Sequence, residues 1–374
     1  MSEEDNNNRT KTGCMVLGGG LLFVLAVVIA IGAQYYRGGA AAPAASADPA
    51  AAAPAGAETI TVTAFVGGEK MPFLKDPRVT SILKDRYGIT VDATKSGSVD
   101  MVQSAMPGKD ALWPSTSTAV DIFKEHGGTW VARENIFSSP LVFDSYDTIV
   151  VALEKAGMVS DRTGVKYLDL PKLVGAMKAG KTWKDLGMTS ATKIKIFSTD
   201  PTKSNSGLMF AGLYASVLNN NEPPDDTTIE ALLPEIKEYF ARLGNMDASS
   251  SDLFAKFLSM GAGAYPMVAA YENQLVEFVD TNPQFADQIK AHVVVLYPEP
   301  TMWSEHPILA LNPKGKKLLD ALHDDEELKK IAAQAHGFRS ALSGVTGNLA
   351  AVDSTVPMPS EAVTGKILAT LTTP

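Results

Sequence analysis

Cysteine and histidine are scarce in this sequence. Cys14 is the single cysteine among 374 residues, so no disulfide can form within the chain and no metal site can be built on cysteines. The five histidines are scattered, without the close spacing by which two histidines on one helix bind a metal ion. We therefore expect neither a metal site nor a cofactor.

Sequence motifs of the common enzyme classes are also missing. There is no Gly-x-Ser-x-Gly nucleophile elbow, no P-loop and no Gly-x-Gly-x-x-Gly turn after a strand. Lysine and arginine form no cluster with interleaved aromatic residues, and the net charge is −9. Such a charge argues against a nucleic-acid partner. An enzyme is therefore the weakest of the functions considered, and no catalytic residue is assigned.

One long apolar run stands near the N-terminus. Residues 12–36 carry no charge, and the run is long enough to cross a bilayer as one helix. Basic residues are more numerous before it than directly after it, so we expect residues 1–11 in the cytoplasm and the rest of the chain outside the inner cell membrane. A cleaved signal peptide is the alternative, with Ile31-Gly32-Ala33 as a tolerable cleavage site.

A linker separates this membrane anchor from the globular part. Residues 37–58 consist almost entirely of Ala, Pro and Gly, a composition that cannot form a core. The first 58 residues hold three basic and five acidic residues, which leaves 30 basic and 37 acidic residues in the remainder. An anionic ligand would therefore have to be held by local donors. The remaining length exceeds what one core fills, which predicts two lobes.

Strand, polar loop and helix follow one another three times after the linker. The expected strands are Thr59–Val66, Ile89–Lys95 and Ala111–Trp113. Their loops contain Gly67-Gly68-Glu69-Lys70, Ser96-Gly97-Ser98 and Pro114–Thr118. This alternation predicts a doubly wound α/β sheet, in which ligands bind at the carboxyl ends of the strands.

The segment Thr192–Asn220 repeats the pattern in the second half. Ile194–Phe197 is a short apolar run typical of a buried strand, and helical spacing begins at Gly207. The hydroxyl-rich loop between them would present free backbone N–H groups at the helix start, where an anion or polar ligand can bind. Plain N-capping by Ser204 or Ser206 is the alternative interpretation.

Three other segments complete the expected layout. Ile136–Leu153 is too long for one strand, so we expect two strands with Asp144–Asp147 at a crossing between the lobes. Pro313–Gly337 has a helical pattern, and a further helix is expected at Ser360–Leu371.

Several short motifs occur in an order that resembles a known family. They are Ser96-Gly97-Ser98, Ser139–Val142, Thr202–Gly207, Tyr271–Gln274, Tyr297–Pro300 with His306-Pro307, and Gly337-Phe338-Arg339. Together they resemble the extracytoplasmic solute-binding proteins of the type II periplasmic-binding fold, nearest to the group of molybdate-, sulfate- and phosphate-type binders. The resemblance covers roughly Thr59 to Arg339.

The resemblance implies two doubly wound α/β lobes joined by two crossover hinges, with a ligand in the cleft between them. Residues 59–145 and 303–374 would form lobe 1, and 146–302 lobe 2. Matching the family's hydroxyl, helix-start and cleft-lining positions, and adding loop residues after the first and third strands, gives ten ligand-binding residues. They are Gly68, Ser96, Ser98, Ser115, Thr202, Ser204, Asn205, Ser206, Tyr271 and Glu272.

The first loop departs from the pattern of the oxyanion binders. Where they usually offer serine or threonine, this chain has Gly67-Gly68-Glu69-Lys70. The carboxylate of Glu69 would oppose a tetrahedral anion unless Lys70 neutralises it or Glu69 points away. A zwitterion, a polar organic molecule and a peptide-like partner are therefore as compatible as phosphate or sulfate.

The function expected from these features is that of a membrane-anchored extracytoplasmic solute-binding protein. It would capture a small polar or anionic solute for an ABC-type transporter, whose permease would be its partner. A solute-binding-like sensor or scaffold subunit of a membrane complex is the alternative, and an unrecognised enzyme is the third possibility.

Overall fold

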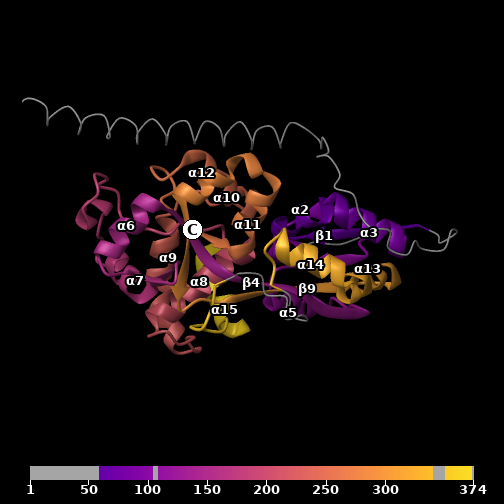
Figure 1. Cartoon of the computed structure of the whole chain (residues 1–374). Helices are drawn as coiled ribbons and strands as arrows, with labels where there is room; N and C mark the ends of the chain where they lie inside the picture. Colours follow the sequence, from indigo (N-terminus) through magenta and orange to yellow (C-terminus); the bar gives the residue numbers. More distant parts are fainter. Residues whose placement is uncertain (1–58, 104–107, 340–349, 373–374) are drawn as a thin grey trace, which may run out of the picture.

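The computed structural model describes residues 59–103, 108–339 and 350–372. Two α/β lobes lie side by side, and strand β4 (Ala132–Tyr146) runs from one into the other (Figure 1). The predicted tail, membrane anchor and linker all lie outside the described residues. Among the described residues, no helix is both long and apolar enough to cross a membrane.

The first lobe contains the three predicted strand–loop–helix units. Its sheet has the order β2-β1-β3-β9-β4, in which the first three strands are parallel and β9 is antiparallel to both of its neighbours. The strands besides β4 are β1 (Ile60–Val66), β2 (Ile89–Lys95), β3 (Ala111–Trp113) and β9 (Trp303–Ala310). The helices are η1 (Gly68–Lys70), α2 (Met71–Lys75), α3 (Pro77–Tyr87), α4 (Ser98–Gln103), α5 (Ser117–Glu125), α13 (Pro313–Asp324) and α14 (Glu326–Gln334).

The second lobe is built on the other half of β4. There β4 pairs with β7 and β8, and the sheet continues through β6 to β5. Its strands are β5 (Val159–Arg162), β6 (Val165–Asp169), β7 (Met267–Tyr271) and β8 (Val293–Glu299). Its helices are α6 (Asp147–Lys155), α7 (Leu170–Lys178), η2 (Trp183–Leu186), α8 (Asn205–Leu218), α9 (Thr228–Ala241), α10 (Ser250–Met260), α11 (Glu272–Thr281), η3 (Pro283–Phe285), α12 (Ala286–His292) and α15 (Glu361–Thr372).

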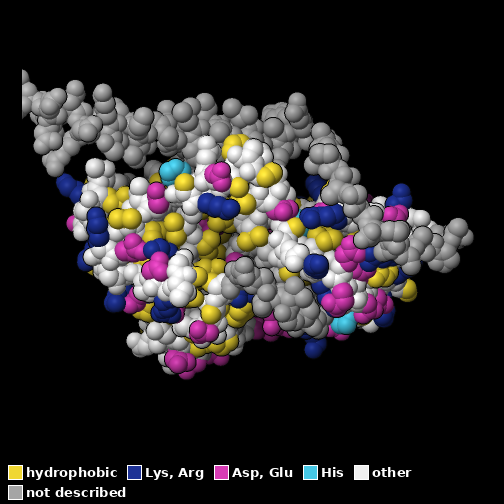
Figure 2. All heavy atoms as spheres, viewed as in Figure 1, with side chains coloured by type: hydrophobic (Ala, Val, Ile, Leu, Met, Phe, Trp, Pro, Cys, Tyr) yellow, Lys and Arg dark blue, Asp and Glu magenta, His cyan; other side chains and the backbone are white. Residues whose placement is uncertain are grey.

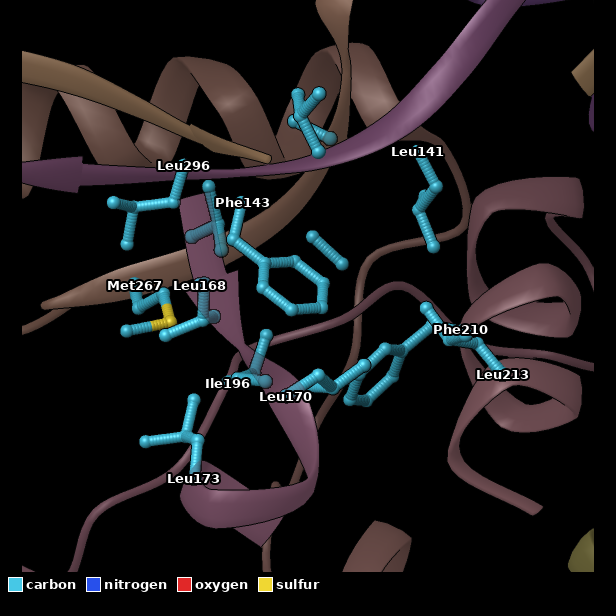
Figure 3. Close-up of a cluster of buried hydrophobic side chains, with 14 of the residues drawn as sticks. Leu141, Phe143, Leu168, Leu170, Leu173, Ile196, Phe210, Leu213, Met267 and Leu296 are labelled. Atoms are coloured by element: carbon cyan, nitrogen blue, oxygen red, sulfur yellow. The ribbon is translucent and has the colours of Figure 1, made fainter. Parts of the chain in front are cut away.

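Helix α8 lies at the centre of the second core. All of its residues except Leu218 are buried, as expected for a helix that is apolar on every side. Figure 3 shows Phe210 of α8 facing Phe143 of β4 across this core, and their ring centroids are 5.8 Å apart in an edge-to-face arrangement. This packing fixes the N-terminus of α8 relative to the sheet.

The crossing between the lobes differs from the prediction. Ile136–Leu153 is not two strands with a crossing at Asp144–Asp147: β4 is continuous to Tyr146, and α6 follows. The change of lobe falls at Pro140, the last residue paired with β9, and Leu141, the first paired with β7. A proline fits there because its nitrogen is not needed as a ladder donor where the strand changes partner.

The C-terminal part also corrects the predicted lobes. Strand β9 and helices α13 and α14 pack in the first lobe, but α15 packs against α9, and its buried residues Val363 and Ile367 join the second core. The predicted helix Pro313–Gly337 is two helices, divided at Asp325, whose carboxylate accepts from the backbone N–H groups of Glu327 and Leu328 and so begins α14.

Candidate functional site

A small cavity lies between the lobes at the carboxyl ends of the first-lobe strands. Its lining consists of Gly67, Gly68, Glu69, Ser96, Gly97, Ser98, Ser115, Ser204, Asn205, Ser249, Ser250 and Tyr271. Seven of the ten predicted residues are among them. The cavity volume is about 10 Å³, roughly the least that one water molecule requires. The structure therefore shows the cleft in a closed arrangement.

Three predicted residues lie outside this lining. Thr202 closes a local turn, because its backbone N–H and its Oγ1 both donate to Asp200 Oδ1 at 2.9 and 2.7 Å. Ser206 is fully buried with its Oγ 2.8 Å from Thr199 Oγ1. Glu272 is held in an ion pair described below.

Two long helices of the second lobe begin at the cavity. Ser204 is the N-cap of α8 but its side chain accepts no capping hydrogen bond, whereas Ser249 caps α10 by accepting from the N–H of Asp252 at 3.3 Å. The N-terminus of a helix carries partial positive charge and backbone N–H groups without helical partners. The start of α8 therefore has the donors that an anionic or polar ligand would need, and ligand binding by this loop stays a prediction.

A cluster of buried polar side chains fills the first-lobe side of the cavity. Lys70 is fully buried and its ammonium has three neighbours: it donates to Glu69 Oε1 and to Ser115 Oγ (2.9 Å) and lies 3.1 Å from His306 Nδ1. Ser115 Oγ donates to Glu69 Oε1 as well. Ser304 Oγ lies 3.3 Å from His306 Nε2 and donates to the carbonyl of Ser115 at 2.5 Å. The three N–H groups of Lys70 are thus all engaged within the chain.

The charges of this cluster follow from its burial. Burial acts to raise the pKa of Glu69, but the attraction of Lys70 and the contact with His306 outweigh it, and the pKa lies well below its usual range. Burial lowers the pKa of Lys70, against the opposing attraction of Glu69. Burial together with the nearby Lys70 lowers the pKa of His306 to about 4, although Glu69 opposes this. An ionised Glu69–Lys70 pair beside a neutral imidazole satisfies these contacts, so Lys70 neutralises Glu69 as the sequence allowed.

Asn205 connects the lobes across the cavity. Its Nδ2 donates to the carbonyl of Ser115 in the first lobe at 2.6 Å and to Tyr271 Oη at 2.9 Å. Its Oδ1 is buried and has no hydrogen-bond partner among the described residues. An unsatisfied buried acceptor carries a free-energy cost that a donor on a ligand would remove.

A second buried ion pair lies beside the cavity. Arg339 donates through Nε and Nη2 to the two carboxylate oxygens of Glu272 at 2.8 and 2.6 Å, and Tyr297 Oη donates to Glu272 Oε1 at 2.7 Å. The backbone of Arg339 pairs with Ser138 of β4. Glu272 therefore ties the second lobe to the segment that leaves the first lobe, and its oxygens are already bonded.

Sequence reasoning missed several residues of the site. Ser249 and Ser250 line the cavity, and Ser304 and His306 support Ser115 and Lys70 from β9. The serines had a detectable signal, because a run of hydroxyl residues directly before a helix is also what marks the start of α8. His306 had none, because its place beside Lys70 arises from the pairing of β9 with β3 and β4.

Solved structures with this architecture come from proteins whose names describe solute binding. A periplasmic thiamin-binding protein has a TM-score of 0.56 at 12% identity, with 84% of this chain and 94% of that chain covered. The sulfate-binding protein SubI from Mycobacterium tuberculosis H37Rv has a TM-score of 0.53 at 16% identity, with 82% of this chain and 96% of that chain covered. The substrate-binding protein of an ABC transporter from Agrobacterium tumefaciens has a TM-score of 0.50 at 14% identity, with 87% of this chain and 100% of that chain covered.

At these identities the likeness shows the fold, so the two-lobed periplasmic-binding fold predicted from the sequence is confirmed. No family model matches the sequence, and the comparison with curated proteins also finds no match.

Proposed function

We propose that this protein binds a small polar or anionic solute between its two lobes. The observation that supports this most directly is the cavity, because hydroxyl groups of both lobes and the start of α8 converge on it. Acidic and basic side chains are interspersed on the face shown in Figure 2, so local donors would have to hold an anion. The fold is also that of proteins named for binding sulfate and thiamin.

Capture requires the lobes to separate first. A cavity of about 10 Å³ cannot hold a solute larger than water. In the proposed cycle the open form takes up the solute, and contacts to both lobes then favour closure. We propose that residues 12–36 anchor the chain in the inner cell membrane, with the lobes outside the cytoplasm, and that an ABC-type permease receives the solute.

A thermal-shift screen of the chain with oxyanions, amino acids, sugars, thiamin and short peptides tests solute binding. A ligand that binds only the folded protein raises the midpoint of unfolding by mass action. For the solute that does so, Ser204→Ala with Asn205→Ala should weaken binding at least ~10-fold, which corresponds to about 1.4 kcal/mol. The exposed Ser190→Ala is the control and should bind normally. Unchanged affinity in the double variant would remove the start of α8 from the site.

A sensor or scaffold subunit of a membrane complex is the second candidate. The buried polar cluster around Lys70 favours this candidate. The ammonium of Lys70 contacts Glu69, Ser115 and His306, so its N–H groups do not point into an open cavity. In that case no compound of the panel shifts the midpoint. Chemical cross-linking of the membrane-bound chain should then yield a specific protein partner.

A further inference from the structure

A larger pocket lies in the second lobe and shares no residue with the cavity between the lobes. Its volume is about 380 Å³, within the range of small-molecule sites. Four segments surround it: the C-terminal end of α7, the stretch before α8, the C-terminal end of α9, and the turn between α10 and β7. The lining residues are Met177, Thr192, Lys193, Ile194, Lys195, Phe197, Tyr239, Arg242, Leu243, Gly263, Ala264 and Pro266.

The inner surface of this pocket is mostly apolar. The phenol of Tyr239 offers no free polar group, because its oxygen donates to the carbonyl of Ile196 at 2.7 Å and accepts from the N–H of Ile196 at 3.1 Å. Phe197 is half-buried and packs on Tyr265 with ring centroids 4.6 Å apart. The pocket thus offers an ordered aromatic and aliphatic surface of the kind that binds the apolar body of a ligand.

Cationic side chains lie at the same pocket. Lys195 Nζ lies 4.4 Å from the ring centre of Phe197 and donates to the carbonyl of Arg242 at 3.4 Å. The guanidinium of Arg242 is already paired with Glu238 at 3.2 Å and Glu235 at 3.9 Å. No carboxylate of the described residues pairs with Lys193 or Lys195, so these two lysines carry the charge that is not compensated. Burial lowers the pKa of Lys195, and an anion beside it would oppose that shift.

We propose that this pocket is a second binding site, for a small organic anion with an apolar body, such as an aryl or alkyl carboxylate. The carboxylate would contact Lys193 and Lys195, and the apolar body would lie against Phe197, Tyr239 and Leu243. Charge complementarity selects this ligand class, because two lysines with no carboxylate partner among the described residues stand next to an apolar surface. The proposal does not depend on the solute of the cleft.

The probe for this site is 3-phenylpropionate, and its pocket-specific readout is the methyl group of Met177. The full chain, labelled with ¹³C-methyl methionine and held in lipid nanodiscs, is titrated while methyl spectra are recorded; Met177→Leu assigns the signal. We expect a saturable shift with 3-phenylpropionate and at least ~10-fold weaker binding of 3-phenylpropylamine, which has the same body and the opposite charge. Equal binding of the two compounds, or no saturable shift, would overturn the proposal.

Matched variants locate the bound anion. Lys195→Met keeps most of the aliphatic stem and should weaken 3-phenylpropionate about tenfold. Gly263→Leu should narrow the pocket and weaken the response, since Gly263 belongs to its lining and a Cβ there meets nothing within 4 Å. Gly175→Leu, at another open glycine of the same lobe, should bind as the unmodified chain does. Unchanged binding in Gly263→Leu would place the anion elsewhere. Asn205→Ala should leave the Met177 response intact, which separates this site from the cleft.

Discussion

At the scale of single residues, the carboxyl of Asp144 is unusual among the described groups. It lies on β4 in the second lobe with no exposed surface, and neither of its oxygens has a hydrogen-bond partner among the described residues. Burial raises the pKa of Asp144 to about 8. The carboxyl is therefore mostly protonated at neutral pH, because ionising it in apolar surroundings costs more than keeping the proton.

Replacing this carboxyl should stabilise the protein in a pH-dependent way. A pKa raised from 3.8 to about 8 on folding gives stability that is fully present below the unfolded value and is lost as pH rises through the folded one. Asp144→Asn should therefore match the unmodified chain near pH 4 and exceed it above pH 8 by up to ~5 kcal/mol. Urea denaturation at the two pH values measures the difference.

The control for this prediction is Asp92→Asn, on the exposed side of strand β2. It should change stability by less than ~0.5 kcal/mol at either pH. A stabilisation by Asp144→Asn that is equal at both pH values would show that the carboxyl is not the group whose ionisation destabilises the fold.

The sequence located the cavity but could not separate lining from capping. Hydroxyl residues before a helix can cap it, line a cleft or close a turn, and all three outcomes occur. Ser249 caps α10 and lines the cavity, Ser204 lines the cavity without a capping hydrogen bond from its side chain, and Thr202 closes a local turn. The sequence places Asp144 at a crossing because Ile136–Leu153 is too long for one strand. Its burial depends on strands that come from distant parts of the chain.

At the scale of elements, local patterns identified the strands and helices that have local causes. β-branched alternation predicted β1 and β2, and α3 ends at Gly88, which has a left-handed backbone. Ile194–Phe197 does not become a full strand, since Phe197 alone bridges to Val268. The fifteen-residue β4 was misread because its length comes from having different partners in the two lobes.

Helix α15 offers a test of the corrected lobe assignment. Ile367 is 1% exposed within the second core, so Ile367→Ala should destabilise the protein by about 2–5 kcal/mol. Hydrogen exchange should show the loss of protection in α9, against which α15 packs. Leu368→Ala, at the adjacent and less buried position, should cost less than ~1.5 kcal/mol. Loss of protection in α13 and α14 would instead return α15 to the first lobe.

At the scale of the whole molecule, the described residues change lobe three times. The first two changes fall within β4 and between β8 and β9. The third follows Phe338, because Phe338 lies in the first core and Val356 lies in the second. The sequence indicated two crossings, through the resemblance to two-lobed binders. The third was missed because the C-terminal part has weak hydrophobic patterning, and only its packing on α9 shows where it belongs.

Closure of the lobes depends on a glycine between β2 and α4. A Cβ at Gly97 would lie 2.1 Å from the carbonyl oxygen of Lys203 in the opposite lobe, a distance that no real contact has. Gly97→Ala should therefore hold the lobes apart while each lobe stays folded. Lys95 and Asp252 report this directly, because their Nζ and Oδ1 atoms meet across the lobes at 2.8 Å and a carbodiimide joins only carboxylates and amines in contact.

We expect mass spectrometry to find the Lys95–Asp252 cross-link in the unmodified chain and at least fivefold less of it in Gly97→Ala. The pair Lys166–Glu154, 2.6 Å apart within the second lobe, should cross-link equally in both proteins. Gly175→Ala, where an added Cβ has open space, should behave as the unmodified chain. If Gly97→Ala cross-links normally at Lys95–Asp252, the lobes meet without the close backbone approach at Gly97, and that approach does not control closure.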